Sequence, residues 1–159
     1  MRFRTNSDVL KLLDANVLMH VANRAEGYER IRETYAAQRA GTIHLSAVTV
    51  CELHYKIGQR SGKKPPKKEN VDRLEELVRL LGVMPFNEAA AKRAAELRCA
   101  LEAIGEPIGL VDSFLAGHAL ALGATVVTDN ESEFRRVKGL TVDNWRRRQP
   151  LGTQPIALI

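Results

Sequence analysis

Short apolar runs alternate along this chain with longer segments that have the periodicity of amphipathic helices. Several of the helical segments end at a glycine, a common helix stop. Strands that alternate with helices predict an α/β protein, an α/β/α sandwich with a parallel central sheet, helices on both faces and right-handed crossovers. The expected strands are residues 9–14, 42–45, 83–86, 124–129 and, at one edge, 141–143; the expected helices are 16–22, 28–40, 47–57, a segment through 71–81, 87–104 and 112–122.

The chain has 159 residues, the usual length of one domain. We expect residues 1–148 to form a single domain and residues 149–159 to be a C-terminal tail. Paired prolines and clustered lysines interrupt the pattern at residues 60–68. This composition is typical of an exposed loop.

Charge and polarity limit the classes of function. Lys and Arg outnumber Asp and Glu by 24 to 19, a formal net charge of +5, which favours a polyanionic partner without separating nucleic acid from an acidic protein. The start of the sequence is polar and no run has membrane length, so we expect a cytoplasmic protein without a membrane contact. Cys51 and Cys99 lie in apolar helical segments, where we expect reduced, buried thiols.

Two aspartates follow predicted strands directly. Asp14 closes the run 9–14 and Asp129 closes the run 124–129, although aspartate is a poor strand residue. In open parallel sheets, sites form beyond the carboxyl ends of the strands. We therefore expect Asp14 and Asp129 to take part in a functional site.

Two further acids have apolar neighbours, Glu52 within residues 48–53 and Asp112 within residues 108–115. If these four acids converge, their repulsion raises one or more of their pKa values, and a hard divalent cation relieves it. Mg²⁺ or Mn²⁺ fits such oxygen ligands, whereas zinc would want a cluster of His or Cys that the sequence lacks. The site can then activate water for attack on a phosphodiester.

Neighbours of these acids are candidates for supporting roles. Asn16 and Thr128 are placed to orient ligands or waters, and the Ser113 hydroxyl can hold a metal-bound water. Structural explanations compete with this interpretation: Asp112 can cap a helix, Asp129 can cap the next turn, and Glu52 can point to solvent.

Four sequence segments resemble those of a known family, the PIN-domain ribonucleases, and within it the VapC toxins of bacterial toxin–antitoxin pairs. The resemblance implies a Mg²⁺- or Mn²⁺-dependent endoribonuclease, a cognate antitoxin that occupies the acidic pocket, and a homodimer. It carries metal binding onto Asp14, Glu52 and Asp112. The matching segments are residues 13–18, 46–53, 105–112 with 116–119, and 127–134 followed by 139–140 and 144–145.

The chain departs from the family pattern in three places. Many relatives have two asparagines where this chain has Asp129 and Asn130, so Asp129 ranks below the other acids as a ligand, either direct or through water. Asp14 also lies farther from the N-terminus than usual. The basic loop is longer, and contact of its lysines with RNA phosphates competes with a solvated loop or an antitoxin contact: Lys63, Lys64, Lys67 and Lys68.

Other polar residues favour structural roles. His118 lies on an apolar helical stripe, which predicts packing or a local hydrogen bond, and Trp145 is expected to cover a sheet edge. Two rival functions stay open: a non-catalytic interaction module with this fold, and a phosphatase with Asp14 as the nucleophile. The phosphatase pattern would need a second aspartate where Asn16 stands.

Overall fold

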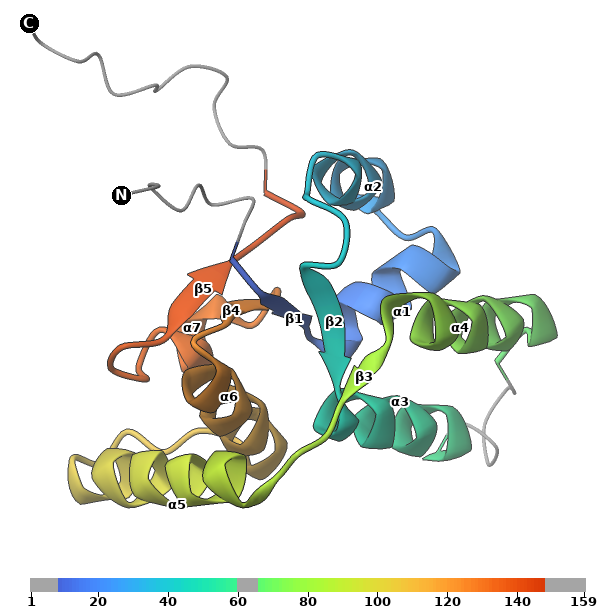
Figure 1. Ribbon diagram of the computed structural model, residues 1–159. Helices are drawn as coiled ribbons and strands as arrows, with labels where there is room; N and C mark the ends of the chain where they lie inside the picture. The colour runs from blue at the N-terminus through green and yellow to red at the C-terminus, as the bar shows by residue number, and fades with distance from the viewer. Residues whose placement is uncertain (1–8, 60–65, 148–159) are drawn as a thin grey trace, which may run out of the picture.

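The computed structural model describes residues 9–59 and 66–147, which form five strands and seven helices in alternation (Figure 1). The predicted α/β architecture is confirmed. The elements are β1 Lys11–Leu13, α1 Ala15–Asn23, α2 Tyr28–Ala36, β2 Ile43–Ser46, α3 Ala47–Gln59, α4 Lys68–Leu81, β3 Val83–Met84, α5 Glu88–Ala103, α6 Leu110–Leu122, β4 Thr125–Val127, α7 Glu131–Phe134 and β5 Thr141–Asp143.

The strands make one parallel sheet in the order β3-β2-β1-β4-β5 (Figure 1). Lys11 of β1 lies opposite Ile43 of β2 on one side and Thr125 of β4 on the other. The chain builds the sheet outward from β1 to β3, then returns to the other side of β1 for β4 and β5. The strand order therefore reverses between β1 and β4, the position where such sheets form their ligand crevice.

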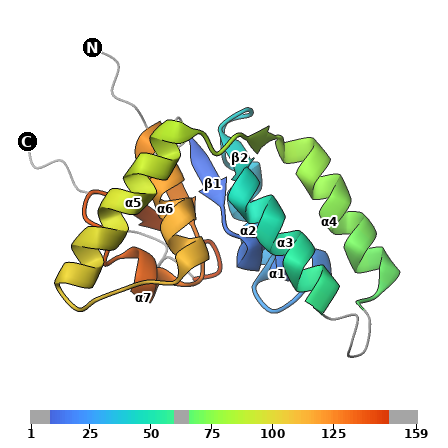
Figure 2. The ribbon, with the colours of Figure 1, turned by 90° about the horizontal axis from the view of Figure 1, so that it is seen from below.

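Each face of the sheet has its own hydrophobic core, because successive strand residues point to opposite faces. Leu12 and Val126 join the core that α5 and α6 cover, while Leu13 and Val127 join the core of α1, α2 and α4. Figure 2 shows α5 and α6 on one side of β1, and α1, α3 and α4 on the other. Helices therefore cover both faces, as predicted.

Helices α5 and α6 pack at very close range. The alanines on the expected helix 87–104 predict such an approach, and Ala90 and Ala94 are buried as expected. Gly117 of α6 lies against Ala94, where an added Cβ would come within 2.4 Å of the Ala94 backbone nitrogen. Only glycine fits at this crossing, and it fixes the position of the helix that carries Asp112.

Several expectations need correction at element boundaries. The second helix ends at Ala36 instead of residue 40, and the short helix α7 was not predicted. Lys68 begins α4, so it leaves the predicted loop, whereas Lys67 precedes the helix as its N-cap residue; Lys63 and Lys64 lie outside the described residues. The predicted tail, residues 149–159, also lies outside them, so its boundary stays a prediction.

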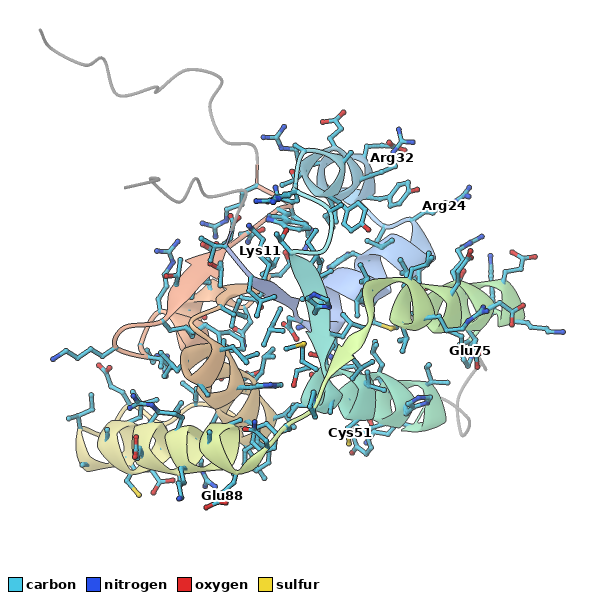
Figure 3. The ribbon with its side chains drawn as sticks, viewed as in Figure 1. Lys11, Arg24, Arg32, Cys51, Glu75 and Glu88 are labelled. Carbon is cyan, nitrogen blue, oxygen red and sulfur yellow. The ribbon has the colours of Figure 1, made fainter. Side chains whose placement is uncertain are left out.

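The two cysteines are free but exposed, so the prediction of buried thiols was wrong. Cys51 lies on the outer surface of α3, two residues from the buried Thr49 and Leu53, and therefore far around the helix from them (Figure 3). Trp145, in contrast, is buried in the core that contains Leu13 and Val127, and its indole N–H donates to Asp143 of β5 (2.9 Å). Among the helices of the described residues, none combines the length and apolarity that a membrane span requires.

Candidate functional site

Asp14 stands at the point where the strand order reverses. It directly follows β1, its backbone N–H donates to the Val127 carbonyl of β4 (2.9 Å), and its side chain is almost fully buried. Thr128, directly after β4, donates its hydroxyl to Asp14 Oδ2 at 2.7 Å. This hydrogen bond supports the predicted role of Thr128 in orienting a ligand residue. Asn16 also faces Asp14, with its Nδ2 3.5 Å from the same oxygen.

Burial dominates the titration of Asp14. Desolvation raises its pKa, the hydrogen bond from Thr128 opposes that rise, and the negative charge of Glu52 adds to it. Asp14 is therefore a carboxylate held close to a second acid. A cation at this position would favour its ionised form.

Glu52 lies on α3 and does not point freely into solvent. Its Oε1 is 2.7 Å from Lys56 Nζ, one helical turn later, and the same ammonium donates to Asn16 Oδ1 at 2.7 Å. Lys56 also lowers the pKa of Asp14 by its charge. The sequence analysis overlooked Lys56, although a Glu followed four residues later by Lys on a helix is a recognisable ion-pair signal.

Asp112 is the third residue of α6, whose N-cap is Gly109, so the capping explanation does not apply. Asn130 Nδ2 donates to Asp112 Oδ2 at 3.1 Å. The pKa of Asp112 is raised to about 7, first by burial, then by a hydrogen bond with Glu133, and then by the charges of Asp14, Glu133 and Glu52. Printed contacts aside, the hydrogen bonds place the three predicted acids around one site: Thr128 donates to Asp14 and Asn130 to Asp112, and the Asn130 N–H donates to Thr128. Lys56 links Glu52 to Asn16, which lies beside Asp14.

Asp14, Glu52 and Asp112 form an acidic cluster, and Glu133 is a fourth acid of it that was not predicted from the sequence. The Gly109 N–H donates to its Oε2 at 2.9 Å, and this bond is the main cause that lowers the pKa of Glu133. The pKa of Asp112 is raised while that of Glu133 is lowered, so Asp112 is the acid of the pair that keeps a proton more readily. The sequence signal that could have identified Glu133 is the number of acidic residues in the segment 127–134.

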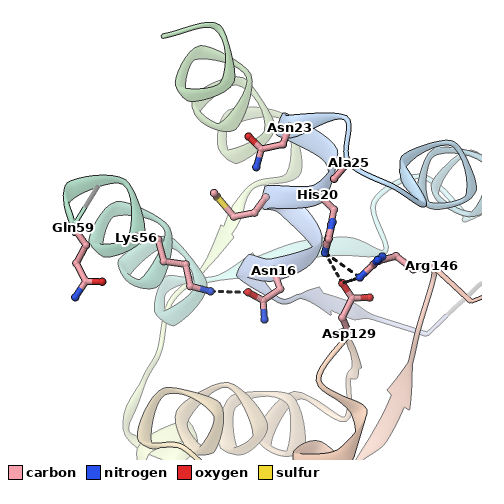
Figure 4. A pocket seen from close by; sticks show the side chains of 9 residues that line it. Asn16, His20, Asn23, Ala25, Lys56, Gln59, Asp129 and Arg146 are labelled. Carbon is pink, nitrogen blue, oxygen red and sulfur yellow. Dashed lines mark hydrogen bonds and ion pairs between the residues drawn. The ribbon is translucent and has the colours of Figure 1, made fainter. Parts of the chain in front are cut away.

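Asp129 turns to a different set of partners. Its Oδ2 lies 3.1 Å from His20 Nε2 and accepts from Arg146 Nη1 at 3.2 Å, as Figure 4 shows. Its neighbour Asn130, not Asp129, reaches Asp112. The charge of Asp129 is thus matched by Arg146, and its role as a metal ligand stays a prediction.

The remaining candidates have structural contacts. Ser113 is buried, and its hydroxyl donates to the Leu110 carbonyl of its own helix (2.6 Å). This hydrogen bond stabilises the start of α6, and the proposed contact with a metal-bound water stays a prediction. His118 is buried with Nδ1 2.8 Å from the Ser46 hydroxyl, and burial lowers its pKa. Its predicted packing role is confirmed. Lys67 and Lys68 are exposed, and their contact with RNA stays a prediction.

The donor set suits a hard divalent cation. Its oxygens come from carboxylates whose repulsion a cation relieves, and the most buried of them, Asp14, lies on a rigid strand end. In the part of the chain that the structure describes, no three His, Cys, Asp or Glu side chains are arranged to hold a metal ion. Mg²⁺ is commonly held by one or two carboxylates together with waters and substrate phosphate, so it stays a prediction for Asp14 and Asp112.

Comparisons with known proteins agree with this geometry. Residues 11–140 match the PIN domain family. Ribonuclease VapC2 of Rickettsia felis is 31% identical over 138 residues, covering 86% of this chain and 98% of that protein. The tRNA(fMet)-specific endonuclease VapC of Shigella flexneri is 32% identical over 135 residues, covering 84% and 96% respectively. A DNA-bound VapBC structure from Salmonella typhimurium superposes with a TM-score of 0.74 at 29% identity, covering 86% of this chain and 98% of that one.

This chain belongs to the PIN domain family, which it matches over residues 11–140, and its parallel α/β fold is shared with the Salmonella typhimurium VapBC structure. Within that family it is of the VapC type, with which it aligns over most of both chains.

Proposed function

We propose that this protein is the toxin of a toxin–antitoxin pair, a Mg²⁺- or Mn²⁺-dependent endoribonuclease. The observation that carries the proposal is the convergence of Asp14, Glu52 and Asp112 at the strand-order reversal, with the pKa of Asp112 raised to about 7. The kinship with VapC ribonucleases supports RNA as the substrate.

Asp14 and Asp112 would hold the ion, with Glu52 bound directly or through water. The chemistry that a bound ion would supply is the activation of a water for attack on the phosphodiester and the stabilisation of charge on the departing oxygen. Thr128 fixes the Asp14 carboxylate, and Asn130 fixes that of Asp112. Asp112, which is hydrogen-bonded to Glu133, is the acid of this pair with the raised pKa, so it is the one that would lose a proton on holding a cation.

The cognate antitoxin is the proposed protein partner. Structures from Rickettsia felis and Salmonella typhimurium are VapBC complexes, which supports a partner of this kind here. An antitoxin that places Arg or Lys among the carboxylates would neutralise them as a metal does and would block the substrate. We also expect a homodimer; a sedimentation velocity run that detects monomer alone would contradict this expectation.

The two rival functions make different predictions. A non-catalytic interaction module would bind the antitoxin without binding a divalent metal, and retention of the acids argues against it. A phosphatase would form an aspartyl phosphate on Asp14, whose Oδ2 accepts from Thr128. Trapping that intermediate would favour the phosphatase.

The direct test is cleavage of RNA by the purified chain. Total RNA and initiator tRNA are incubated with Mn²⁺ or Mg²⁺, and the ends of the products are mapped. The proposal expects discrete cuts that need the metal and stop when EDTA is added. Glu88→Gln, an exposed acid-to-amide change on α5, serves as the control and should cut normally. Equal cutting in EDTA would contradict a metal-dependent site.

A further inference from the structure

A second pocket of about 780 Å³ opens beside the acidic cluster (Figure 4). It shares Asn16 and Lys56 with that cluster and extends along α1 to the segment that follows β5. Seven of its nine lining residues have polar or charged side chains, and the other two are Met19 and Ala25. The full lining is Asn16, Met19, His20, Asn23, Ala25, Lys56, Gln59, Asp129 and Arg146.

The pocket has a positive balance of charge and many hydrogen-bond donors. Lys56 and Arg146 are permanent cations, while Asp129 is the acid of the lining. His20 and the amides of Asn16, Asn23 and Gln59 add polar groups without a fixed charge. Two cations against one acid is the opposite balance to that of the neighbouring acidic cluster, and both cations are ion-paired, Lys56 with Glu52 and Arg146 with Asp129.

Arg146 is held in a defined position at this pocket. Its Nη1 lies 3.2 Å from Asp129 Oδ2 and 3.1 Å from His20 Nε2. Its stem packs against Gly27, where an added Cβ would come within 3.2 Å of Arg146 Cγ. Both polar contacts use Nη1, and Nε is buried without a partner among the described residues. A guanidinium has five N–H donors, and the Arg146 side chain is 32% exposed, so donors other than the buried Nε–H are open to an anionic ligand.

We propose that this pocket binds the nucleotide that flanks the scissile phosphate, with Arg146 on its phosphate and Asp129 as the residue that positions Arg146. Arg is well suited to phosphate because its planar fork matches the phosphate oxygens. The inference rests on the proposed function, because an RNA strand in the acidic cluster continues past the shared residues Asn16 and Lys56. A protein segment would want apolar anchors, which this lining provides sparsely.

The test measures RNA binding without cleavage. The full chain is titrated into a fluorescently labelled single-stranded RNA oligonucleotide in EDTA, and anisotropy is recorded over a range of KCl concentrations. Arg146→Met should weaken binding about tenfold, and the slope of log affinity against log salt should fall by about 0.7, the value for one lost phosphate contact on a single strand. Arg146→Lys should keep the slope and recover part of the affinity.

A second variant guards against a folding defect in Arg146→Met. Asn23 is exposed, and its Oδ1 accepts from Asn70 Nδ2 at 2.7 Å, a bond that Asn23→Asp keeps. The new negative charge in the pocket should weaken RNA binding. The matched control is Arg147→Met, which removes a highly exposed guanidinium paired with Glu131 and should leave RNA binding unchanged.

The outcomes separate this inference from the proposed function. If the wild-type chain cleaves RNA while Arg146→Met and Asn23→Asp bind it normally, the pocket proposal is overturned and the nuclease stands. If these variants bind RNA normally but lose the antitoxin, the pocket serves a protein and the proposal is also overturned. If they lose RNA binding while the wild type cleaves nothing, the proposed function falls, and with it the place beside a scissile phosphate, and the pocket stands only as an RNA-binding site.

Discussion

Asp112 carries a carboxyl group whose pKa is raised from 3.8 to about 7, so near neutral pH it is divided between its protonated and ionised forms. Burial is the first cause, and the neighbouring acids add to it. A divalent ion needs the ionised form, so proton and metal compete for this side chain. We therefore expect a divalent metal ion to displace a proton from the acidic cluster when it binds.

This competition predicts a pH dependence of metal binding. Mn²⁺ affinity should rise between about pH 6 and pH 8 as Asp112 loses its proton, and RNA cleavage at limiting Mn²⁺ should rise with it. Calorimetric titrations near pH 7 in buffers of different ionisation enthalpy should detect proton release on binding. An affinity that is constant over this range would show that no proton is displaced.

The same shift predicts that Asp112→Asn stabilises the metal-free protein. In the unfolded chain Asp112 ionises above about pH 4, but in the folded chain only above about pH 7, so rising pH over this window favours unfolding. The resulting loss in the free energy of unfolding is complete above about pH 7 and absent below about pH 4. Asparagine removes it and can still donate to Glu133.

In urea unfolding with EDTA at pH 8, Asp112→Asn should gain about 1–2 kcal/mol, a value reduced for the partial exposure of the site to solvent. At pH 3.5 the variant and the wild type should unfold alike. Glu88→Gln, at an exposed position on α5, is the control at both pH values. A variant less stable than wild type at pH 8 would contradict the argument.

Lys56 already places a positive charge in the acidic cluster. Its ammonium is 2.7 Å from both Glu52 Oε1 and Asn16 Oδ1, so it opposes the entry of a metal ion. Lys56→Met should tighten Mn²⁺ binding about tenfold at pH 8, as expected from removing a like charge at close range in a hydrated site. Calorimetry measures this directly.

The matched control is Lys92→Met on α5, which breaks an exposed pair of the same helical spacing with Glu88. Its Mn²⁺ affinity should equal that of the wild type. If Lys56→Met instead weakened Mn²⁺ binding, Lys56 would be supporting the site by holding Glu52 and Asn16 in place.

Among the secondary-structure elements, the crossing of α5 and α6 is the contact most sensitive to one methyl group. Gly117→Ala would place a Cβ 2.4 Å from the backbone nitrogen of Ala94, so the helices must separate. We expect a loss of about 1–3 kcal/mol in the free energy of unfolding, measured with urea. Cleavage should fall too, because α6 carries Asp112.

Gly58→Ala is the control for helix propensity. At Gly58 in α3 an added Cβ meets nothing within 4 Å, so alanine should stabilise the helix by about 0.5–1 kcal/mol. If Gly117→Ala were as stable as Gly58→Ala, the close approach of α5 and α6 would not be a constraint on the fold.

The elements themselves could largely be predicted from sequence, because they follow from local periodicity. Apolar runs and glycine stops predicted the five strands and six of the helices, while α7 is too short to have a periodicity. Cys51 and Cys99 were misjudged because apolar neighbours in sequence do not tell which side of a helix faces the core. Burial depends on the residues three and four positions away.

The candidate site could be predicted only in part, for a related reason. The strand-end rule applies to Asp14, and the apolar settings of Glu52 and Asp112 are visible in sequence. The partners of Asp129 are not, since His20 and Arg146 come from α1 and from the segment after β5. Such contacts depend on the complete fold, which brings distant segments to one crevice.

At the scale of the whole molecule, two regions of opposite charge adjoin within a chain of net charge +5. The acidic cluster calls for a metal ion, and the basic pocket beside it, with Lys56 and Arg146, suits the anionic strand on which that ion would act. An antitoxin that places cationic side chains in the acidic cluster would block metal binding there and RNA binding in the adjoining pocket. This division of charge is the physical basis of the proposed nuclease.

Asp14 is the residue on which the account depends most, so the decisive measurement compares Asp14→Asn with the wild type in one cleavage assay. With RNA and Mn²⁺, the variant should cleave at least about 1,000-fold more slowly, because the ion loses its most buried ligand. Its circular dichroism spectrum and its RNA binding in EDTA should match those of the wild type. Cleavage by Asp14→Asn at the wild-type rate would contradict the acidic cluster as the catalytic site.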